Sequence, residues 1–288
     1  MRVIDAHVHL YPPEAGREPT AWAAARGEPH WAELCTRRRR DGRPVQTFPT
    51  VDELLRAMDA DGVDRAVLLG WYWEQPATCV LQNTFYAECV RAHPDRLAAF
   101  ATVQPAAGPA ALAEVRRAVG EGLVGLGELS PHSQHVAVDD PVWGELLTLA
   151  GELNLPVNLH VTDPASRKFP GRVDTPLEDF VQLARAFPGT KFILAHWGGG
   201  PVYAEALKIF PNVHFDTAAS PLMYEPGAAG QMLAALPAGR VLYGSDYPLV
   251  LYPKNEALPG FAGFLDELKA AGASAATLGG NAEREFAW

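Results

Sequence analysis

The feature that most limits how this chain can fold is a regular alternation between short apolar segments and longer amphipathic segments. Eight segments rich in Val, Ile, Leu and Phe recur along the sequence, and each is followed by a stretch with helical period. This alternation is typical of strand–helix units built around a parallel sheet. The predicted strands are residues 3–8, 65–69, 97–103, 124–129, 156–161, 191–196, 212–216 and 241–246.

The amphipathic segments predict one helix after each strand, and local capping patterns support several of the boundaries. Thr50 precedes the first helix and is followed three residues later by Glu53, which is a capping-box pattern. Asp140 stands directly before Pro141, a residue pair typical of a helix start. We further predict a short final helix within residues 278–286, capped by Asn281. The other predicted helices are residues 51–60, 80–92, 110–120, 141–153, 177–187, 202–210, 227–236 and 260–271.

Eight strand–helix units without a break in composition predict an α/β fold, a (β/α)8 TIM barrel that forms a single domain over residues 1–288. The length agrees with this, because such barrels typically need about 250 residues. Strand ends in a barrel converge on one mouth, where active sites lie. Residues that close the predicted strands are therefore the first candidates for function.

Charge and cysteine content narrow the class of partner. The formal net charge of -10 disfavours nucleic acid, because affinity for a phosphate backbone comes from cationic side chains. A small-molecule substrate is the expected partner, and a homo-oligomer remains open. No apolar run reaches the ~18 residues of a membrane span, and no targeting segment is recognisable. The three cysteines are widely spaced and odd in number, which favours a reduced, cytoplasmic protein.

One connection is far longer than the few residues usual between a strand and its helix. Residues 11–49 follow the first predicted strand, so in a barrel they would lie over the mouth. This first insertion carries Trp22, Trp31, the run 37–40 of four arginines, and Arg43. We predict that it forms a lid; a solvated basic excursion or an oligomer contact is the alternative.

Histidines and one carboxylate at the predicted strand ends indicate a metal site. His7 and His9 end the first strand, and side chains two residues apart in a strand point to the same side. His160, His196 and Asp246 each close a different apolar segment, so the barrel would bring them to the same mouth. Imidazoles with a carboxylate suit Zn²⁺, with Mn²⁺ and Fe²⁺ as alternatives.

These motifs, taken in order, resemble the amidohydrolase superfamily, and more narrowly its amidohydrolase-related branch, which includes zinc decarboxylases of unsaturated and aromatic acids. The resemblance spans the chain and implies that His7, His9, His160 and Asp246 ligate the ion. It also implies that His196 binds a second ion or orients the attacking water. The motifs are Asp5-Ala6-His7-Val8-His9, Leu159-His160-Val161, Leu194-Ala195-His196-Trp197-Gly198-Gly199, Tyr243-Gly244-Ser245-Asp246-Tyr247-Pro248 and Gly279-Gly280-Asn281-Ala282.

The end of the fourth predicted strand departs from the pattern of many superfamily members, which bridge two ions with a carbamylated lysine there. This chain has Gly127-Glu128-Leu129 instead, with no lysine. Glu128 either bridges two ions, as a glutamate does in TatD-type nucleases, or hydrogen-bonds a ligand histidine from outside the metal shell. We expect one ion rather than two, because the four implied ligands and a water already complete a shell.

The expected reaction is hydrolysis of a small amide, lactone or ester, because a bound divalent ion activates water and polarises a carbonyl. His196 or Asp246 would carry the proton. The alternative is decarboxylation of an aromatic or conjugated acid, with a cation from the arginine run 37–40 holding the carboxylate. Two further alternatives are a TatD-type phosphoesterase and an inactive binding module.

Aromatic side chains near the expected mouth are candidates for contact with a flat substrate. Trp71, Tyr72 and Trp73 follow the second predicted strand, and Trp197 follows His196. Each of these rings would serve equally well as packing in the core. We predict substrate contact for Trp71, Trp73 and Trp197, together with Arg40.

Overall fold

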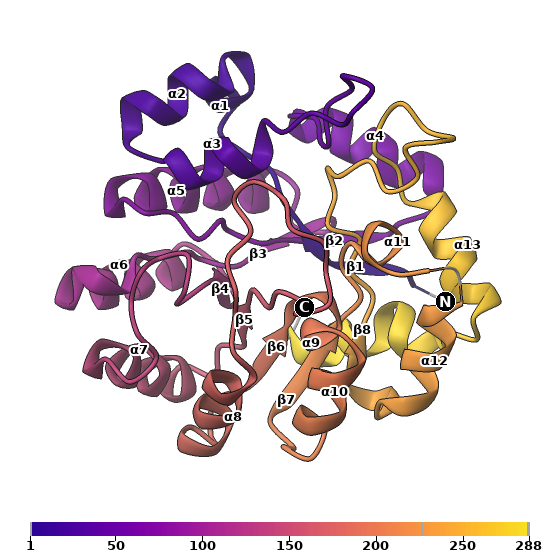
Figure 1. Cartoon of the computed structure of the whole chain (residues 1–288). Helices are drawn as coiled ribbons and strands as arrows, with labels where there is room; N and C mark the ends of the chain where they lie inside the picture. The colour runs from indigo at the N-terminus through magenta and orange to yellow at the C-terminus, as the bar shows by residue number, and fades with distance from the viewer. Residues whose placement is uncertain (1, 226, 287–288) are drawn as a thin grey trace.

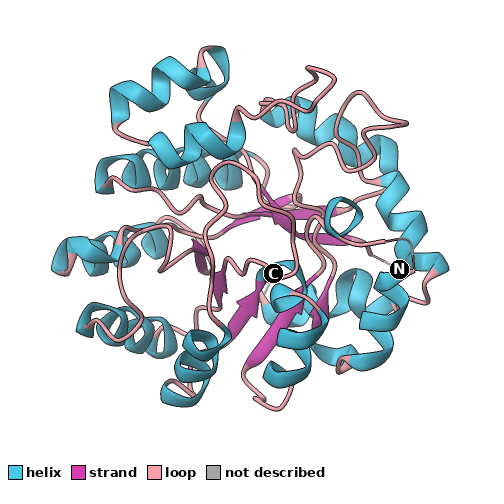
Figure 2. Cartoon of the chain, viewed as in Figure 1, coloured by secondary structure: helices cyan, strands magenta, loops and turns pink. Residues whose placement is uncertain are grey.

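Parallel strands form a closed barrel at the centre of the protein, and helices cover its outside (Figures 1 and 2). The computed structural model describes residues 2–225 and 227–286. The predicted (β/α)8 fold is thus confirmed, and each predicted strand has a counterpart. The strands are β1 (Ile4–Val8), β2 (Arg65–Leu68), β3 (Leu97–Ala99), β4 (Leu126–Leu129), β5 (Val157–Leu159), β6 (Phe192–Leu194), β7 (Val213–Asp216) and β8 (Val241–Leu242).

Hydrogen bonding follows the strand order in two sheets, β1-β2-β3 and β4-β5-β6-β7-β8, and all the pairs are parallel. Parallel bridges close the ring at its two seams. Ala101, just beyond β3, pairs with Leu126 of β4, and Val8 of β1 pairs with Tyr247, beyond β8. Ring closure removes free sheet edges and directs every strand end toward one mouth.

Each predicted outer helix is present, with ends displaced by a few residues. Thr50 and Glu53 form the expected capping box, and the Asp140 side chain accepts a hydrogen bond from Val142 N. In the described ranges no helix is both long and apolar enough to cross a bilayer. The outer helices are α4 (Val51–Asp61), α5 (Pro76–Ala92), α6 (Pro109–Gly120), α7 (Pro141–Glu152), α8 (Leu177–Ala186), α10 (Pro201–Leu207), α12 (Ala228–Ala235) and α13 (Ala262–Ala270).

Shorter helical turns complete the described chain: α1 (Pro13–Arg17), α2 (Pro19–Arg26), α3 (Pro29–Cys35), α9 (Ala195–Gly199), α11 (Ser220–Met223), α14 (Asn281–Glu285), η1 (Pro105–Ala107), η2 (Ala238–Arg240) and η3 (Ala276–Gly280). The final helix was predicted, but its expected cap is wrong. Asn281 is the first residue of α14, and its amide donates to Ala238 O in η2 and to Val241 O at the start of β8. This amide fastens the tail to the barrel.

The core of the barrel itself has two parts, one outside the strands and one inside the ring. Outward-facing strand residues pack against the helices around large buried side chains such as Trp143 and Phe264. Inside the ring, Ile4, Phe100 and Ile193 pack with Phe286, beyond the end of α14. The opposite end of the barrel is left for polar side chains.

The first insertion is largely helical rather than a plain loop, because α1, α2 and α3 lie within it. Figure 1 shows these helices beside the barrel, above α5 in that view. Trp31 is fully buried, and its ring lies 5.2 Å from Tyr11 and 5.3 Å from Trp22, measured between centroids. Beyond α3, the chain makes an antiparallel bridge between Gln46 and Leu249, after β8. Aromatic packing and this bridge hold the insertion against the mouth.

Candidate metal centre

Six side chains that could ligate a metal meet at the carboxyl ends of the strands. They form two groups of three, and within each group the ligand atoms all lie within 4.8 Å of one another. The first group comes from β1, the residue after it, and the turn after β8. The second comes from β4, the residue after β5, and α9 after β6. The groups are His7, His9 and Asp246, and Glu128, His160 and His196.

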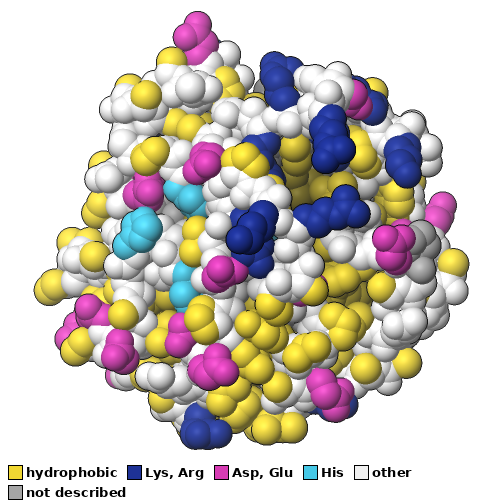
Figure 3. All heavy atoms as spheres, viewed as in Figure 1, with side chains coloured by type: hydrophobic (Ala, Val, Ile, Leu, Met, Phe, Trp, Pro, Cys, Tyr) yellow, Lys and Arg dark blue, Asp and Glu magenta, His cyan; other side chains and the backbone are white. Residues whose placement is uncertain are grey.

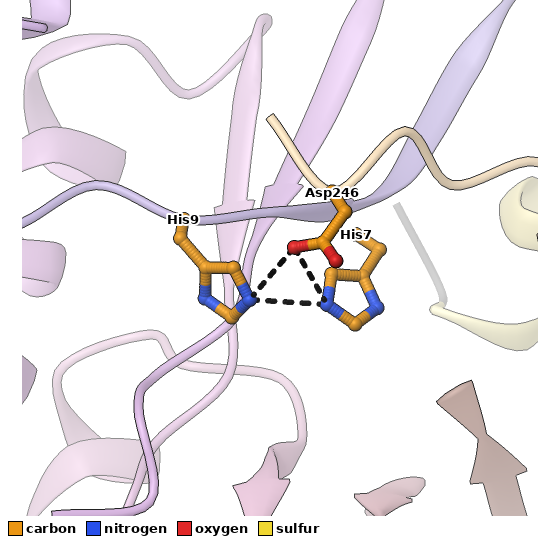
Figure 4. Close-up of side chains that lie close together, drawn as sticks. All are labelled: His7, His9 and Asp246. Atoms are coloured by element: carbon orange, nitrogen blue, oxygen red, sulfur yellow. Dashed lines mark hydrogen bonds and ion pairs between the residues drawn. The ribbon is translucent and has the colours of Figure 1, made fainter. Parts of the chain in front are cut away.

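Figure 4 shows the first group converging on a shared point. The Nε2 atoms of His7 and His9 lie 3.1 Å apart. Asp246 Oδ1 is 3.8 Å from His7 Nε2 and 3.5 Å from His9 Nε2. Three potential ligand atoms therefore surround one position, as a metal shell requires.

The Nδ1 atoms of His7 and His9 both have hydrogen-bond partners, and these partners determine the protonation of the Nε2 atoms. His7 Nδ1 lies 2.8 Å from Asp216 Oδ2, and His9 Nδ1 lies 3.0 Å from the carbonyl oxygen of Leu69. Both oxygens accept, so both Nδ1 atoms donate their protons, and the two Nε2 atoms face each other. A pair of facing nitrogen lone pairs needs a cation, either a proton on one ring or a metal ion. The donor set fits a divalent ion.

Glu128 is the member of the second group that also faces the first, because its two oxygens point in different directions. Its Oε1 is 2.9 Å from His160 Nδ1 and 3.9 Å from His196 Nε2. Its Oε2 is 3.7 Å from His9 Nε2 and 4.0 Å from His7 Nε2. By distance His160 is grouped with Glu128 and His196, and its predicted role as a ligand beside His7, His9 and Asp246 stays a prediction.

Burial and neighbouring charges change the pKa values of the ionisable groups in the site, and the two effects often oppose each other. Burial by itself lowers the pKa of His7, but Asp216, Asp246 and Glu128 raise it to about 10. Burial and the neighbouring His7 lower the pKa of His9 to about 3. Burial also raises the pKa of the Asp246 carboxyl to about 7. Buried carboxylates this close together require a compensating positive charge.

Glu128 reaches its position because the residue before it is glycine. Gly127 has a φ of +133°, and a Cβ there would lie 2.6 Å from Asn158 O in β5. Any other side chain would force β4 and β5 apart at the point where Glu128 and His160 leave them. The apolar pattern of the strand gives no indication of this requirement.

Asp216 is a residue of the site that sequence reasoning missed. It is fully buried at the end of β7 and contacts His7, Asn158 and the backbone of His196. Burial alone would raise its pKa, but His7 and the hydrogen bonds it accepts lower it, so the carboxylate is ionised. The available signal was its position, because Asp216 closes a predicted strand just as Asp246 was expected to.

A cavity of about 320 Å³ opens above the two groups, a volume in the range of small-molecule sites. His9, Glu128, His160, His196 and Asp246 line it at the barrel end. The first insertion and the segment after β5 supply much of the remaining wall. In Figure 3 an apolar hollow is bordered by Lys and Arg side chains. The site is therefore accessible to a small anionic molecule.

Of the four predicted substrate-contact residues, Trp71 lies in the cavity wall and the other three do not. Trp71 lines the cavity beside Tyr72, and their rings stack at 4.3 Å.

Trp73 and Trp197 are instead completely buried in the core, where their indole nitrogens donate to Gln82 and Ser220. Arg40 is exposed and does not line the cavity; Arg37 and Arg39 do. These three predicted contacts are corrected, because neighbouring side chains on one segment point in different directions.

Comparison with known proteins identifies both a family and a fold. The family model described as Amidohydrolase matches residues 4–288. A comparison with curated proteins finds no match.

Among solved structures, 5-carboxyvanillate decarboxylase from Sphingomonas paucimobilis is similar at a TM-score of 0.74 and 19% identity, covering 99% of each chain. The same enzyme from Novosphingobium aromaticivorans, complexed with manganese and 4-hydroxy-3-methoxy-5-nitrobenzoic acid, gives 0.72 and 17%, covering 100% of this chain and 96% of that one. A probable 2-pyrone-4,6-dicarboxylic acid hydrolase from Acinetobacter baumannii, with citric acid bound, gives 0.64 and 18%, covering 100% of both. At these identities the similarity shows the fold.

Proposed function

Because this chain belongs to the amidohydrolase family, we propose that it is a metal-dependent hydrolase acting on a lactone, ester or amide of a small carboxylated ring. The observation that carries the proposal is the position of Glu128, with one oxygen directed to each ligand group. If each group held one ion, the pair would suit hydrolysis, because bound ions would activate water and polarise the carbonyl. We therefore propose two ions in place of the single ion expected from the sequence.

The residues that would hold the ions are the two groups themselves. Glu128 belongs to the second group, and its Oε2 also lies 3.7 Å from His9 Nε2 in the first. Imidazole and carboxylate ligands suit Zn²⁺, and Mn²⁺ and Fe²⁺ remain alternatives. When bound, such ions supply a nucleophilic water at neutral pH and withdraw charge from the substrate carbonyl.

The chain's own residues move the proton and orient the substrate. Asp246 lines the cavity and is a carboxylate within reach of both groups, its Oδ2 lying 3.9 Å from His196 Nδ1. His196 donates from Nδ1 to Ala218 O, so only its Nε2 has a lone pair, which would either bind an ion or, with no ion there, accept a proton. We assign proton transfer from water to the leaving group to Asp246 or His196.

Two of the three arginines in the cavity wall support this substrate class. Arg37 and Arg39 come from the first insertion, and within the described part of the chain neither forms an ion pair with a carboxylate. The Arg37 guanidinium lies 4.5 Å from the centroid of the Phe169 ring, which holds it at the mouth. Trp71 and Tyr72 supply a flat wall beside His160. A planar ring bearing a carboxylate matches these surfaces.

Decarboxylation of a carboxylated aromatic acid is the second candidate. It is favoured by the same arginines and by the two similar 5-carboxyvanillate decarboxylases. In that reaction the carbon–carboxyl bond breaks, carbon dioxide leaves with no change of oxidation state at the metal, and the ring carbon takes up a proton. A TatD-type phosphoesterase and an inactive binding module would use the same cavity without these products.

The test is to load purified protein with Zn²⁺ or Mn²⁺ and to offer carboxylated lactones, esters, amides and hydroxybenzoates. Acid release by pH-stat reports hydrolysis, and carbon dioxide evolution reports decarboxylation. Hydrolysis without carbon dioxide supports the proposal, whereas carbon dioxide from the benzoates supports the second candidate. No turnover by protein that has bound metal would contradict both and favour a binding module.

A further inference from the structure

Asp216 is the only described carboxylate that hydrogen-bonds to members of both ligand groups. Its Oδ2 accepts from His7 Nδ1 at 2.8 Å and from Asn158 Nδ2 at 3.1 Å. Its Oδ1 accepts from the backbone nitrogens of His196 at 3.0 Å and Ala218 at 3.1 Å. All four partners are donors, and an ionised carboxylate offers about four acceptor positions.

We propose that Asp216 is the positioning residue for both ligand groups: it fixes the His7 tautomer and holds the turn that carries His196. The inference rests on the proposed metal-dependent function, because it concerns how these histidines are prepared for ions. Asp216 itself lies behind the ligands and does not line the cavity.

For His7, the contact decides which ring nitrogen faces the ion. As long as Asp216 accepts from Nδ1, the lone pair of Nε2 is directed toward His9 and Asp246. If the proton of the neutral ring moved to Nε2, that nitrogen would donate to His9 Nε2, 3.1 Å away. The two rings would then satisfy each other, and the first group would lose a ligand.

For His196, the contact supports an unusual backbone. His196 has φ 57° and ψ 49°, in the left-handed region that side chains other than glycine seldom adopt. Asp216 Oδ1 holds both the His196 and Ala218 nitrogens, and Ala218 O in turn accepts from His196 Nδ1 at 3.1 Å. One carboxylate thus orients the His196 backbone directly and its ring through Ala218.

The substitution Asp216→Asn keeps the shape of the side chain but removes part of its capacity to accept hydrogen bonds. The asparagine amide has nearly the same shape but replaces one oxygen by a donating NH₂ group. If NH₂ faces His7, the His7 tautomer must switch; if it faces the backbone nitrogens, the turn at His196 is repelled. Either orientation damages one ligand group and spares the other.

The experiment compares Asp216→Asn with wild type in metal-free and Zn²⁺-loaded form. Zn²⁺ affinity is measured by chelator competition, and the His7 tautomer by ¹⁵N NMR. We expect affinity for at least one ion to fall by about 10–100-fold, with either a shift of the His7 proton to Nε2 or selective loss from the second group. Asp61→Asn is the matched control. Asp61 Oδ2 accepts hydrogen bonds from the backbone nitrogens of Phe261 and Ala262, and the amide oxygen of asparagine can accept the same bonds.

Unchanged affinity and an unchanged tautomer in Asp216→Asn would overturn the inference. If the variant fails to fold, Zn²⁺-loaded wild type still decides: a proton on His7 Nδ1 supports the inference, and its absence overturns it. Failure of the proposed function has a different signature, since wild-type protein would then bind no ion at all or would bind ions without turnover.

Discussion

Replacing Glu128 by Gln separates a carboxylate shared by two ions from one that only supports a histidine. Without its charge, the second group retains two imidazoles, His160 and His196, whereas the first keeps His7, His9 and Asp246. We therefore expect the metal-to-protein ratio to fall from two to one. Turnover should fall by more than the about 10–100-fold typical of an outer hydrogen-bond partner.

The loss of one ion should also be visible in thermal unfolding. At an ion concentration about 100 times the dissociation constant, each ion stabilises the folded protein by about 2.7 kcal/mol. One kcal/mol changes Tm by roughly 2–4 °C in domains of about 150–250 residues, so the metal-dependent rise in Tm should shrink by roughly 5–11 °C in Glu128→Gln.

Elemental analysis and metal titrations of Tm measure both effects. Glu114→Gln is the matched control, since that buried carboxylate binds Asn83 and Arg117 on the helical side. One ion in both wild type and Glu128→Gln, with activity reduced less than 100-fold, would refute the shared-ligand geometry.

Four further outcomes follow from the same contacts. His9→Ala should remove most of the metal from the first group and nearly all activity while circular dichroism stays unchanged; full metal content would contradict its role as a ligand. In Asp246→Asn, activity should fall much further than metal content, because an amide remains a weak ligand but accepts no proton; equal losses in the two assays would assign a purely structural role. Arg37→Ala should raise KM about 10-fold or more for carboxylated substrates, with Arg40→Ala as the exposed control. Burial raises the pKa of the Glu28 carboxyl from 4.5 to about 7, so between these pH values the folded state binds more protons than the unfolded state. The free energy of unfolding should therefore fall as pH rises from 4.5 to about 7, and this fall should be absent in Glu28→Gln.

The periodic pattern of the sequence was sufficient for the barrel, because parallel strands buried on both faces must be short and apolar while the helices that cover them must be amphipathic. It was less informative about helix starts. The outer helix α5 begins at Pro76 rather than at residue 80, and α1, α2 and α3 each begin with proline. Proline at the first helical position was the signal that periodicity overlooked.

The strand ends indicated which residues approach the mouth, but not how their side chains are grouped. His160 and Glu128 are 32 residues apart, and their pairing depends on the close packing of β4 on β5 at Gly127. Asp216 was overlooked because its partners, among them His7, come from distant segments. Trp73 was assigned to the substrate because it follows the second predicted strand, although its ring is fully buried in the core.

The potential metal ligands and the cavity wall come from different segments of the chain, so substrate preference can change independently of metal binding. All six potential metal ligands belong to the barrel strands or to the turns directly after them, whereas Arg37, Arg39 and Phe169 belong to the first insertion and the segment after β5. Mutations, insertions or exchanges in those upper segments alter what the cavity accepts without disturbing the ligands. For laboratory evolution, libraries confined to residues 34–46 and 163–173 should therefore yield new substrate preferences at a low rate of inactive, metal-free variants.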